Sequence, residues 1–214
     1  MTRGNALVSA IIGHGGASGY RPENSHGALD LAMAQGAYGV SITVAPTSDG
    51  RLAVVGGVDL SECTDVRKRV ELASRFGAKR IHSQMVRGWF SVDFDSSDLA
   101  RLNYSEPRPR MRKASAEAAT SAPEHIAFLG ETIESLMSAH RGIQIWIDFP
   151  LPTQVAEWGF SYADLVARVG RRVGGAVVAA LLVAGYLTLA LISGSTARPG
   201  TFVQGVDISG KDPA

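Results

Sequence analysis

The sequence has little of what would point to a disulfide framework, a thiolate metal site or a nucleic-acid partner. Cysteine occurs once, at Cys63, which excludes an internal disulfide. The histidines are not spaced, relative to Cys63 or to one another, as the ligands of a metal site are. The 21 basic and 20 acidic residues leave a net charge of +1, so no overall field attracts nucleic acid. We expect Cys63 to be a small half-buried residue and expect no nucleic-acid partner.

We also expect no secretory signal at the start of the chain. One arginine and a short apolar run lead directly into a glycine-rich turn, without a cleavage region. The length of 214 residues is enough for one domain of ordinary size with an appendage.

One long apolar run is present, at residues 173–192 (VGGAVVAALLVAGYLTLALI), and it carries no charge. A helix of this length crosses about 30 Å of hydrocarbon at roughly 1.5 Å per residue, so the run predicts one transmembrane helix. Arg171 and Arg172 come just before it, and Arg198 is the next charge after it. The positive-inside rule then places the N-terminal domain in the cytoplasm and the tail, 193–214, outside. A wholly buried core helix is the alternative.

The first quarter of the chain has the pattern of an α/β fold. An apolar run ends in a glycine-rich turn that carries His14, and Asn24 or Ser25 can cap the helix that follows. Alternating segments then predict two more strands, separated by an Asp-Gly turn. The expected elements are a strand at 6–12, a helix ending near 35, and strands at 38–45 and 51–55.

The rest of the chain is less regular. We expect a basic solvated loop at 106–113 (EPRPRMRK), because no aromatic residues interleave its charges, and a loop or linker at 114–123. The other expected elements are helical segments at 66–76, 95–102, 129–140 and 160–172, and a fourth strand at 143–149.

These segments together resemble the glycerophosphodiester phosphodiesterase family. The matching stretches, in order, are IIGHGGASGYRPEN, AMAQGA, PTSDGRLAVV, TDV, GWFSVDF and IQIWIDFPLPT. The resemblance implies a domain at 1–172 related to the TIM barrel. It also implies a divalent metal, Mg²⁺ or Ca²⁺, and hydrolysis of glycerophosphodiesters to an alcohol and glycerol 3-phosphate.

Carried over residue by residue, the resemblance keeps only part of the family's site. His14 stands at the first catalytic histidine, Glu23 at the glutamate of the PEN signature, and Asp148 at the third metal carboxylate. The other positions are replaced. The family's arginine corresponds here to Gly15, and its Glu-x-Asp metal ligands correspond to Ser41 and Thr43. Its second histidine and the neighbouring aspartate correspond to Gly56 and Gly57, and its lysine corresponds to Pro150.

These replacements predict impaired or absent catalysis. A single carboxylate with two hydroxyls holds Mg²⁺ or Ca²⁺ weakly, and the phosphate loses its cations. The alternative function is a non-catalytic single-pass membrane protein associated with the cell envelope. His14 alone would fit a structural role in a glycine-rich turn. A dinucleotide loop is disfavoured, because no acidic residue closes the next strand.

Two further expectations concern the ends of the domain. A TIM barrel needs eight strand–helix units, and the four strands expected here leave open edges, so we expect an incomplete barrel that a homo-oligomer could cover. Residues 198–214 (RPGTFVQGVDISGKDPA) resemble the first strand of VanW-like, peptidoglycan-associated extracytoplasmic modules, with a polar tail as the alternative.

Overall fold

The computed structural model describes residues 10–173, 177–183, 186–192, 202–203 and 206–207. The opening β–α–β–β order predicted from sequence is confirmed, as β1 (Ile12–His14), α1 (His26–Ala34), β2 (Gly39–Pro46) and β3 (Leu52–Val54). The side chain of Ser25 caps α1 by accepting a hydrogen bond from the backbone N–H of Ala28 at 3.2 Å.

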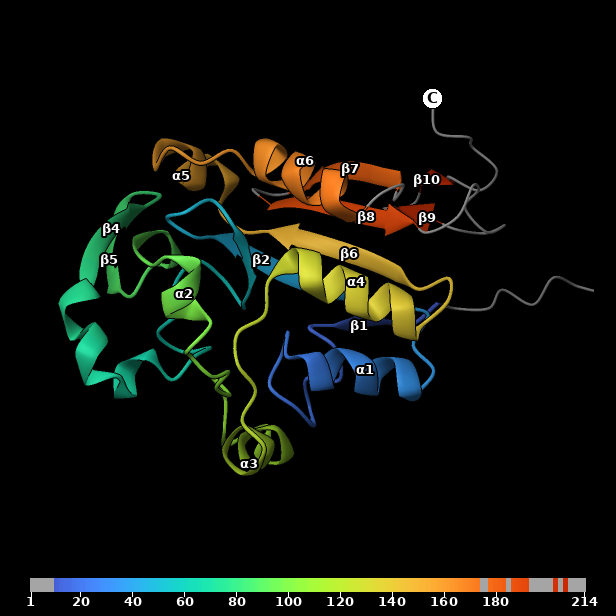
Figure 1. Cartoon of the computed structure of the whole chain (residues 1–214), viewed down its shortest axis with the longest axis horizontal. Helices are drawn as coiled ribbons and strands as arrows, with labels where there is room; N and C mark the ends of the chain where they lie inside the picture. Colours follow the sequence, from blue (N-terminus) through green and yellow to red (C-terminus); the bar gives the residue numbers. More distant parts are fainter. Residues whose placement is uncertain (1–9, 174–176, 184–185, 193–201, 204–205, 208–214) are drawn as a thin grey trace, which may run out of the picture.

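The central sheet of the described chain runs in the order β1-β2-β6-β8-β7 (Figure 1). β1, β2 and β6 (Gln144–Phe149) are parallel neighbours, as βαβ units require, while β3 pairs with β2 in the antiparallel sense. Among the described strands β1 pairs only with β2, so the sheet does not close into a barrel through this strand. The architecture of the described chain is therefore α/β, built around an open sheet of parallel and antiparallel strands.

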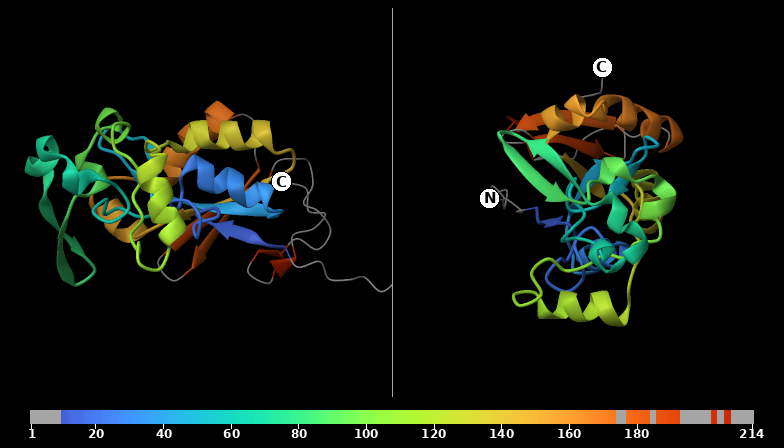
Figure 2. Two further views of the ribbon diagram at one scale, coloured as in Figure 1. Left: turned by 90° about the horizontal axis from the view of Figure 1, so that it is seen from below. Right: turned by 90° about the vertical axis from the view of Figure 1, so that its left-hand side faces the viewer.

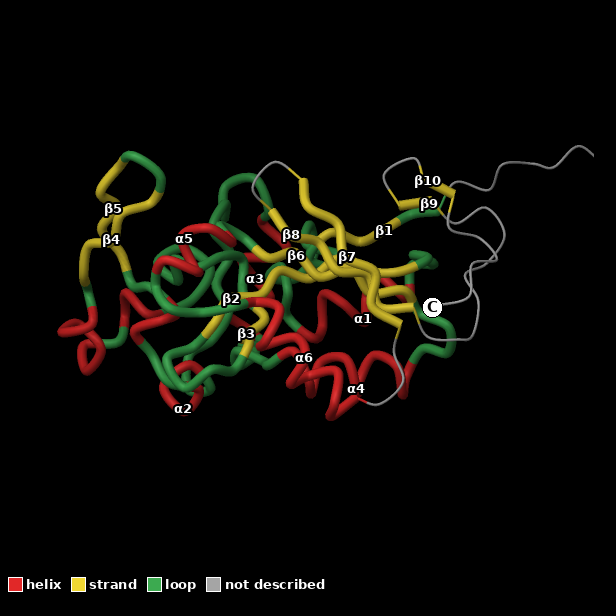
Figure 3. The backbone as a smooth tube through the Cα atoms, turned by 90° about the horizontal axis from the view of Figure 1, so that it is seen from above, coloured by secondary structure: helices red, strands yellow, loops and turns green. Residues whose placement is uncertain are grey.

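Helices cover one side of this sheet (Figure 3). They are α1, α4 (Leu129–Ala139) and α6 (Tyr162–Val173), of which α4 and α6 were predicted with nearly these bounds. The core beneath them is apolar and continuous. Its fully buried members include Leu29, Val40, Ile42, Leu136 and Phe149. The opposite side of the parallel strands carries polar side chains among apolar ones, and a pocket lies there.

A second group of elements lies between β3 and α4. Its members are η1 (Val66–Lys68), η2 (Val70–Arg75), β4 (Gly77–Ile81), β5 (Gln84–Gly88), η3 (Ser91–Asp93), α2 (Ser96–Leu99) and α3 (Lys113–Ser121), and α5 (Pro152–Glu157) follows β6. The single helix predicted at 66–76 is instead two 3₁₀ turns, and the hairpin of β4 and β5 was not predicted. The β4–β5 hairpin projects at one end of the molecule (Figure 2).

The loop predicted at 114–123 is wrong, because most of it belongs to α3. Alternating alanines favour a helix here, and tertiary contacts fix it. The buried Ser115 donates a hydrogen bond from Oγ to Oε2 of the buried Glu106, at 2.6 Å.

The prediction of a transmembrane helix over 173–192 is wrong. Two antiparallel strands occupy most of this run, β7 (Val177–Val183) and β8 (Tyr186–Ile192), and β8 also pairs with β6. Valine favours strands, and the open edge of β6 offers unsatisfied backbone groups that a strand can pair and a helix cannot. Nowhere in the ranges described does a helix have the length and apolar character to span a membrane.

The predicted VanW-like tail lies largely outside the described residues. Within 193–214 the structure describes only β9 (Phe202–Val203) and β10 (Val206–Asp207), which pair with each other. The domain boundary at 172, the position of the N-terminal domain relative to a membrane and the homo-oligomer stay predictions.

Candidate functional site

Strand register brings four of the predicted site positions together. In the parallel pairing of β1 with β2, His14 lies opposite Ser41, and in the pairing of β2 with β6, Thr43 lies opposite Asp148. Because side chains alternate along a strand, Ser41 and Thr43 share one face of β2, opposite to the buried Ile42. The sheet therefore gathers residues that are far apart in sequence into one place.

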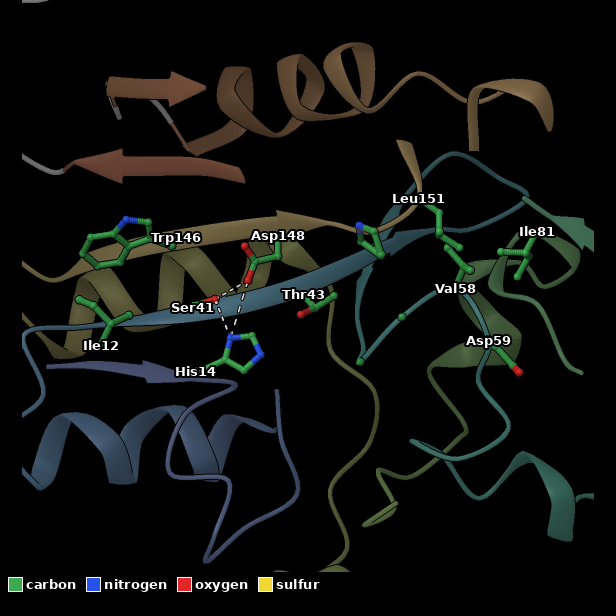
Figure 4. Close-up of a pocket in the computed structure, with 13 residues that line it drawn as sticks. Ile12, His14, Ser41, Thr43, Val58, Asp59, Ile81, Trp146, Asp148 and Leu151 are labelled. Atoms are coloured by element: carbon green, nitrogen blue, oxygen red, sulfur yellow. Dashed lines mark hydrogen bonds and ion pairs between the residues drawn. The ribbon is translucent and has the colours of Figure 1, made fainter. Parts of the chain in front are cut away.

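His14, Ser41 and Asp148 form a hydrogen-bonded chain (Figure 4). The hydroxyl of Ser41 donates to Oδ2 of Asp148 at 2.5 Å, and Nδ1 of His14 lies 3.2 Å from Oγ of Ser41. Ser41 has one hydroxyl proton and gives it to Asp148, so Nδ1 of His14 is the donor in the second contact. His14 Nδ1 also lies 3.8 Å from Asp148 Oδ2. In the neutral ring Nε2 is then the acceptor, on a side chain that is 75% exposed.

These residues line a pocket of about 840 Å³. Its walls are mostly apolar, with Trp146 and Ile12 on one side of the polar chain and Val58, Ile81 and Leu151 on the other (Figure 4). The remaining lining residues are Thr43, Gly56, Gly57, Asp59 and Pro150. None of the described residues that line the pocket is Lys or Arg. A phosphate placed here would meet carboxylates without a cation.

The residues present do not fit the divalent metal that the resemblance implies. The described ranges contain no group of three or more His, Cys, Asp or Glu that could hold an ion. Asp148 accepts the hydroxyl proton of Ser41, and Asp59, farther along the pocket, accepts hydrogen bonds from the backbone N–H and the hydroxyl of Ser61. Mg²⁺ and Ca²⁺ require several oxygen ligands with enough negative charge, and this donor set is too small.

Glu23, predicted as a catalytic residue, is not among the residues that line the pocket. Its Oε2 lies 2.9 Å from Nη1 of Arg112, which also lies 3.8 Å from Oε1 of Glu106. The side chain of Glu106 is 1% exposed, so Arg112 partners two carboxylates at the base of α3. The segment predicted as a solvated loop thus carries residues that hold Glu23 in place. No spacing in the sequence signals this contact.

The glycines at Gly15 and Gly56 leave the space that Glu23 fills. Gly15 has a φ of +62°, and a Cβ there would lie 2.8 Å from Cβ of Glu23. A Cβ at Gly56 would lie 3.0 Å from Oε1 of Glu23. Side chains at these two positions, such as the arginine and histidine of the family pattern, would require Glu23 or the backbone to shift. The replacements and the position of Glu23 are therefore one linked arrangement.

Asn24 fixes the turn that carries His14. Its Oδ1 accepts a hydrogen bond from the backbone N–H of Thr43 at 2.9 Å, and its own backbone N–H donates to the carbonyl of Gly15 at 2.9 Å. Asn24 is 2% exposed and has a φ of 66°, a left-handed conformation that Asn tolerates better than most residues. The sequence suggested only a helix cap at this position.

Cys63 is buried beside this region, and burial raises the pKa of its thiol to about 12. The reactive thiolate is therefore almost absent at neutral pH. We expect iodoacetamide to leave the folded protein unlabelled at neutral pH and to label it readily in denaturant, as followed by intact-mass spectrometry. Equal labelling rates in both states would contradict this prediction, and Cys63→Ala is the blank.

Comparisons with known proteins identify the family of this chain. Residues 14–174 match the model of the glycerophosphoryl diester phosphodiesterase family. The match covers well over half of the chain. This chain belongs to that family.

Individual relatives match shorter segments. A glycerophosphodiester phosphodiesterase of Arabidopsis thaliana is 29% identical over 98 residues, which are 46% of this chain and 26% of the relative. The glycerophosphodiester phosphodiesterase of Haemophilus influenzae is 32% identical over 96 residues, 45% of this chain and 24% of the relative. The matched segments thus span about a quarter of these curated relatives.

The fold comparison points in the same direction. A crystal structure described as a glycerophosphoryl diester phosphodiesterase, from Silicibacter pomeroyi, superposes with a TM-score of 0.58 at 18% identity. The superposition covers 80% of this chain and 56% of that structure. The predicted α/β, TIM-barrel-like fold is therefore confirmed, over little more than half of that longer chain.

Proposed function

We propose that this chain is a glycerophosphodiester phosphodiesterase-family protein with impaired or no hydrolytic activity. The observation that carries the proposal is the composition of the pocket. Its polar groups are a histidine, hydroxyls and carboxylates, without Lys or Arg among the described lining residues. Hydrolysis of a phosphodiester requires charge stabilisation on the phosphoryl oxygens and an acid for the leaving alkoxide.

The His14–Ser41–Asp148 chain does not replace this machinery. Ser41 donates to Asp148 and accepts from His14, so the imidazole does not remove the serine proton as the base of a nucleophilic triad does. His14 Nε2 could still accept a proton from a bound water or hydroxyl. One proton acceptor without cations gives little rate, because such groups act as a unit and their losses are not additive.

A glycerophosphodiester-type molecule remains the ligand class that family membership favours, and weak Mg²⁺ or Ca²⁺ binding is the most we propose for the metal. This function does not depend on the membrane association, on the cytoplasmic placement of the N-terminal domain, or on the homo-oligomer that would cover open strand edges. Cell fractionation tests the membrane association and the cytoplasmic placement, and light scattering tests the homo-oligomer.

The proposal predicts that glycerophosphocholine is not turned over above background. Release of glycerol 3-phosphate by the wild-type protein should equal that by His14→Ala, with or without Mg²⁺ or Ca²⁺. The reason is that removing His14 cannot slow a reaction that lacks its metal ligands and phosphate cations. A coupled glycerol 3-phosphate assay measures the rate.

An active family enzyme, assayed in parallel, establishes the detection limit of this experiment. A metal-dependent rate that falls in His14→Ala would overturn the proposal and show a working phosphodiesterase. A metal-independent rate that falls in His14→Ala would also overturn it, because it would assign catalysis to the hydrogen-bonded chain alone.

A further inference from the structure

The β4–β5 hairpin has one side that is exposed to solvent in the described chain. β4 and β5 form a two-stranded sheet of their own, joined through pairs from Gly77↔Gly88 to Ile81↔Gln84. The hairpin projects from the body at the end opposite the strands β9 and β10 (Figures 1 and 3). An isolated two-stranded sheet is marginal in water, so its inner side must be held by the body.

The inner side of the hairpin is held in this way. Nζ of Lys79 lies 2.8 Å from Oδ1 of Asp93, and Ile81 is one of the residues that line the pocket. Gly88 is buried against the carboxylate of Asp59. One side of the hairpin is thus built into the domain and into the pocket wall.

The outer side is exposed and combines cations with apolar groups. Cross-strand pairing puts Ala78 opposite Arg87 and Arg80 opposite Met85, and all four are exposed. Met85 is 62% exposed, and Phe76, which precedes β4, is 40% exposed. The guanidinium of Arg87 lies 5.3 Å from the centre of the Phe76 ring. We call Phe76, Ala78, Arg80, Met85 and Arg87 the hairpin face.

The charge on this hairpin is of one sign. Residues 77–88 contain Lys79, Arg80 and Arg87 and no Asp or Glu, although the whole chain is nearly neutral at +1. Lys79 is paired with Asp93, which leaves two arginines facing solvent on the hairpin face. Large apolar side chains beside unopposed arginines fit a surface that has both phosphates and an apolar layer beneath them.

We propose that the hairpin face binds the surface of an anionic phospholipid bilayer. Arg80 and Arg87 contact headgroup phosphates, and Met85 enters the boundary between headgroups and acyl chains. Phe76, whose ring centre lies 4.5 Å from that of Trp89, contributes only its exposed part to this contact. A nucleic acid offers phosphates but does not reward the burial of a methionine, so the apolar half of the face favours lipid. Because Ile81 is on the same hairpin, docking there brings the wall of the pocket close to the membrane surface.

The test is co-sedimentation of the full chain with vesicles of phosphatidylcholine alone and of phosphatidylcholine mixed with phosphatidylglycerol. Wild-type protein should bind the anionic vesicles, and salt should weaken the binding. Arg80→Glu/Arg87→Glu should lower the affinity by at least about tenfold, and Met85→Ser should lower it several-fold. Circular dichroism checks that each variant is folded.

The matched control is Arg110→Glu/Met111→Ser. These residues are also exposed, Met111 at 80%, but they lie in the segment before α3. The control should bind as the wild type does. The proposal would be overturned if the control lost as much affinity for anionic vesicles as the hairpin variants do. It would also be overturned if the hairpin variants still bound through the apolar segment 173–192, or if the wild type bound neutral vesicles equally well. Binding to an oligonucleotide that needs the arginines and is indifferent to Met85 would overturn it in favour of nucleic acid.

Discussion

The double variant Ser41→Glu/Thr43→Asp is expected to show a rise in melting temperature with Ca²⁺ that the wild-type protein lacks. The two positions lie on the same face of β2, and both line the pocket beside Asp148, which is the register partner of Thr43. Three carboxylates converging there would supply the charged oxygen ligands that the wild-type pocket does not have.

Linkage sets the size of this effect. An ion that binds only the folded state at a hundred times its Kd adds about 2.7 kcal/mol to the free energy of unfolding. For a chain of this size that corresponds to roughly 5–10 °C in melting temperature. Without the ion the three carboxylates repel one another, so the variant should melt below the wild type in chelator. Differential scanning fluorimetry with Ca²⁺, Mg²⁺ and chelator measures both directions.

Ser41→Gln/Thr43→Asn is the matched control, since it has side chains of similar size without charge. It should show no response to Ca²⁺. A wild-type protein that responds as strongly as the acidic variant would contradict the prediction and, with it, the proposed loss of the metal site. An acidic variant that is folded and indifferent to both ions would show that the backbone around β2 and β6 cannot present three ligands.

Gly16→Ala is expected to lower the free energy of unfolding by about 2–5 kcal/mol. Gly16 has a φ of +80°, and a Cβ there would lie 2.4 Å from the backbone carbonyl carbon and oxygen of Ala28. Backbone atoms in the first turn of α1 cannot rotate away as a flexible side chain can. The turn would have to lift off the helix, and the hydrogen bond from Ala17 N–H to the Ala28 carbonyl, at 2.8 Å, would be strained.

Gly19→Ala in the same turn is the control. No atom lies within 4 Å of a Cβ at Gly19, and its φ is not in the left-handed range. Its free energy of unfolding should stay within about 0.5 kcal/mol of the wild type. Urea denaturation compares the three proteins. Similar losses at both glycines would show that the whole turn needs glycine, and a stable Gly16→Ala would show that the turn is not packed on α1.

The two variants also bear on the site, because the turn carries His14. If the turn lifts from α1, His14 loses its position opposite Ser41, and the chain from His14 through Ser41 to Asp148 breaks. Gly16 is therefore needed for the geometry of the pocket as well as for stability.

Much of the central unit could be predicted from local patterns. The Ser25 cap, the alternation along β2 and the amphipathic α4 depend on neighbours a few residues away, and the structure has them nearly where the sequence placed them. Where local patterns were ambiguous, the prediction failed. The apolar run at 173–192 is hydrophobic enough for either a buried helix or a buried strand, so its hydrophobicity alone does not distinguish the two. The edge of β6 is available for pairing, and this favours strands.

The sequence by itself determined the family and the α/β class, because these depend on which residues stand in an ordered set of motifs. Only the tertiary structure decided what became of the remaining residues. It joined His14, Ser41 and Asp148 through strand register, and it paired Glu23 with Arg112 outside the pocket lining. Contacts between residues so far apart in sequence arise from the packing of strands and helices, and no local pattern records them.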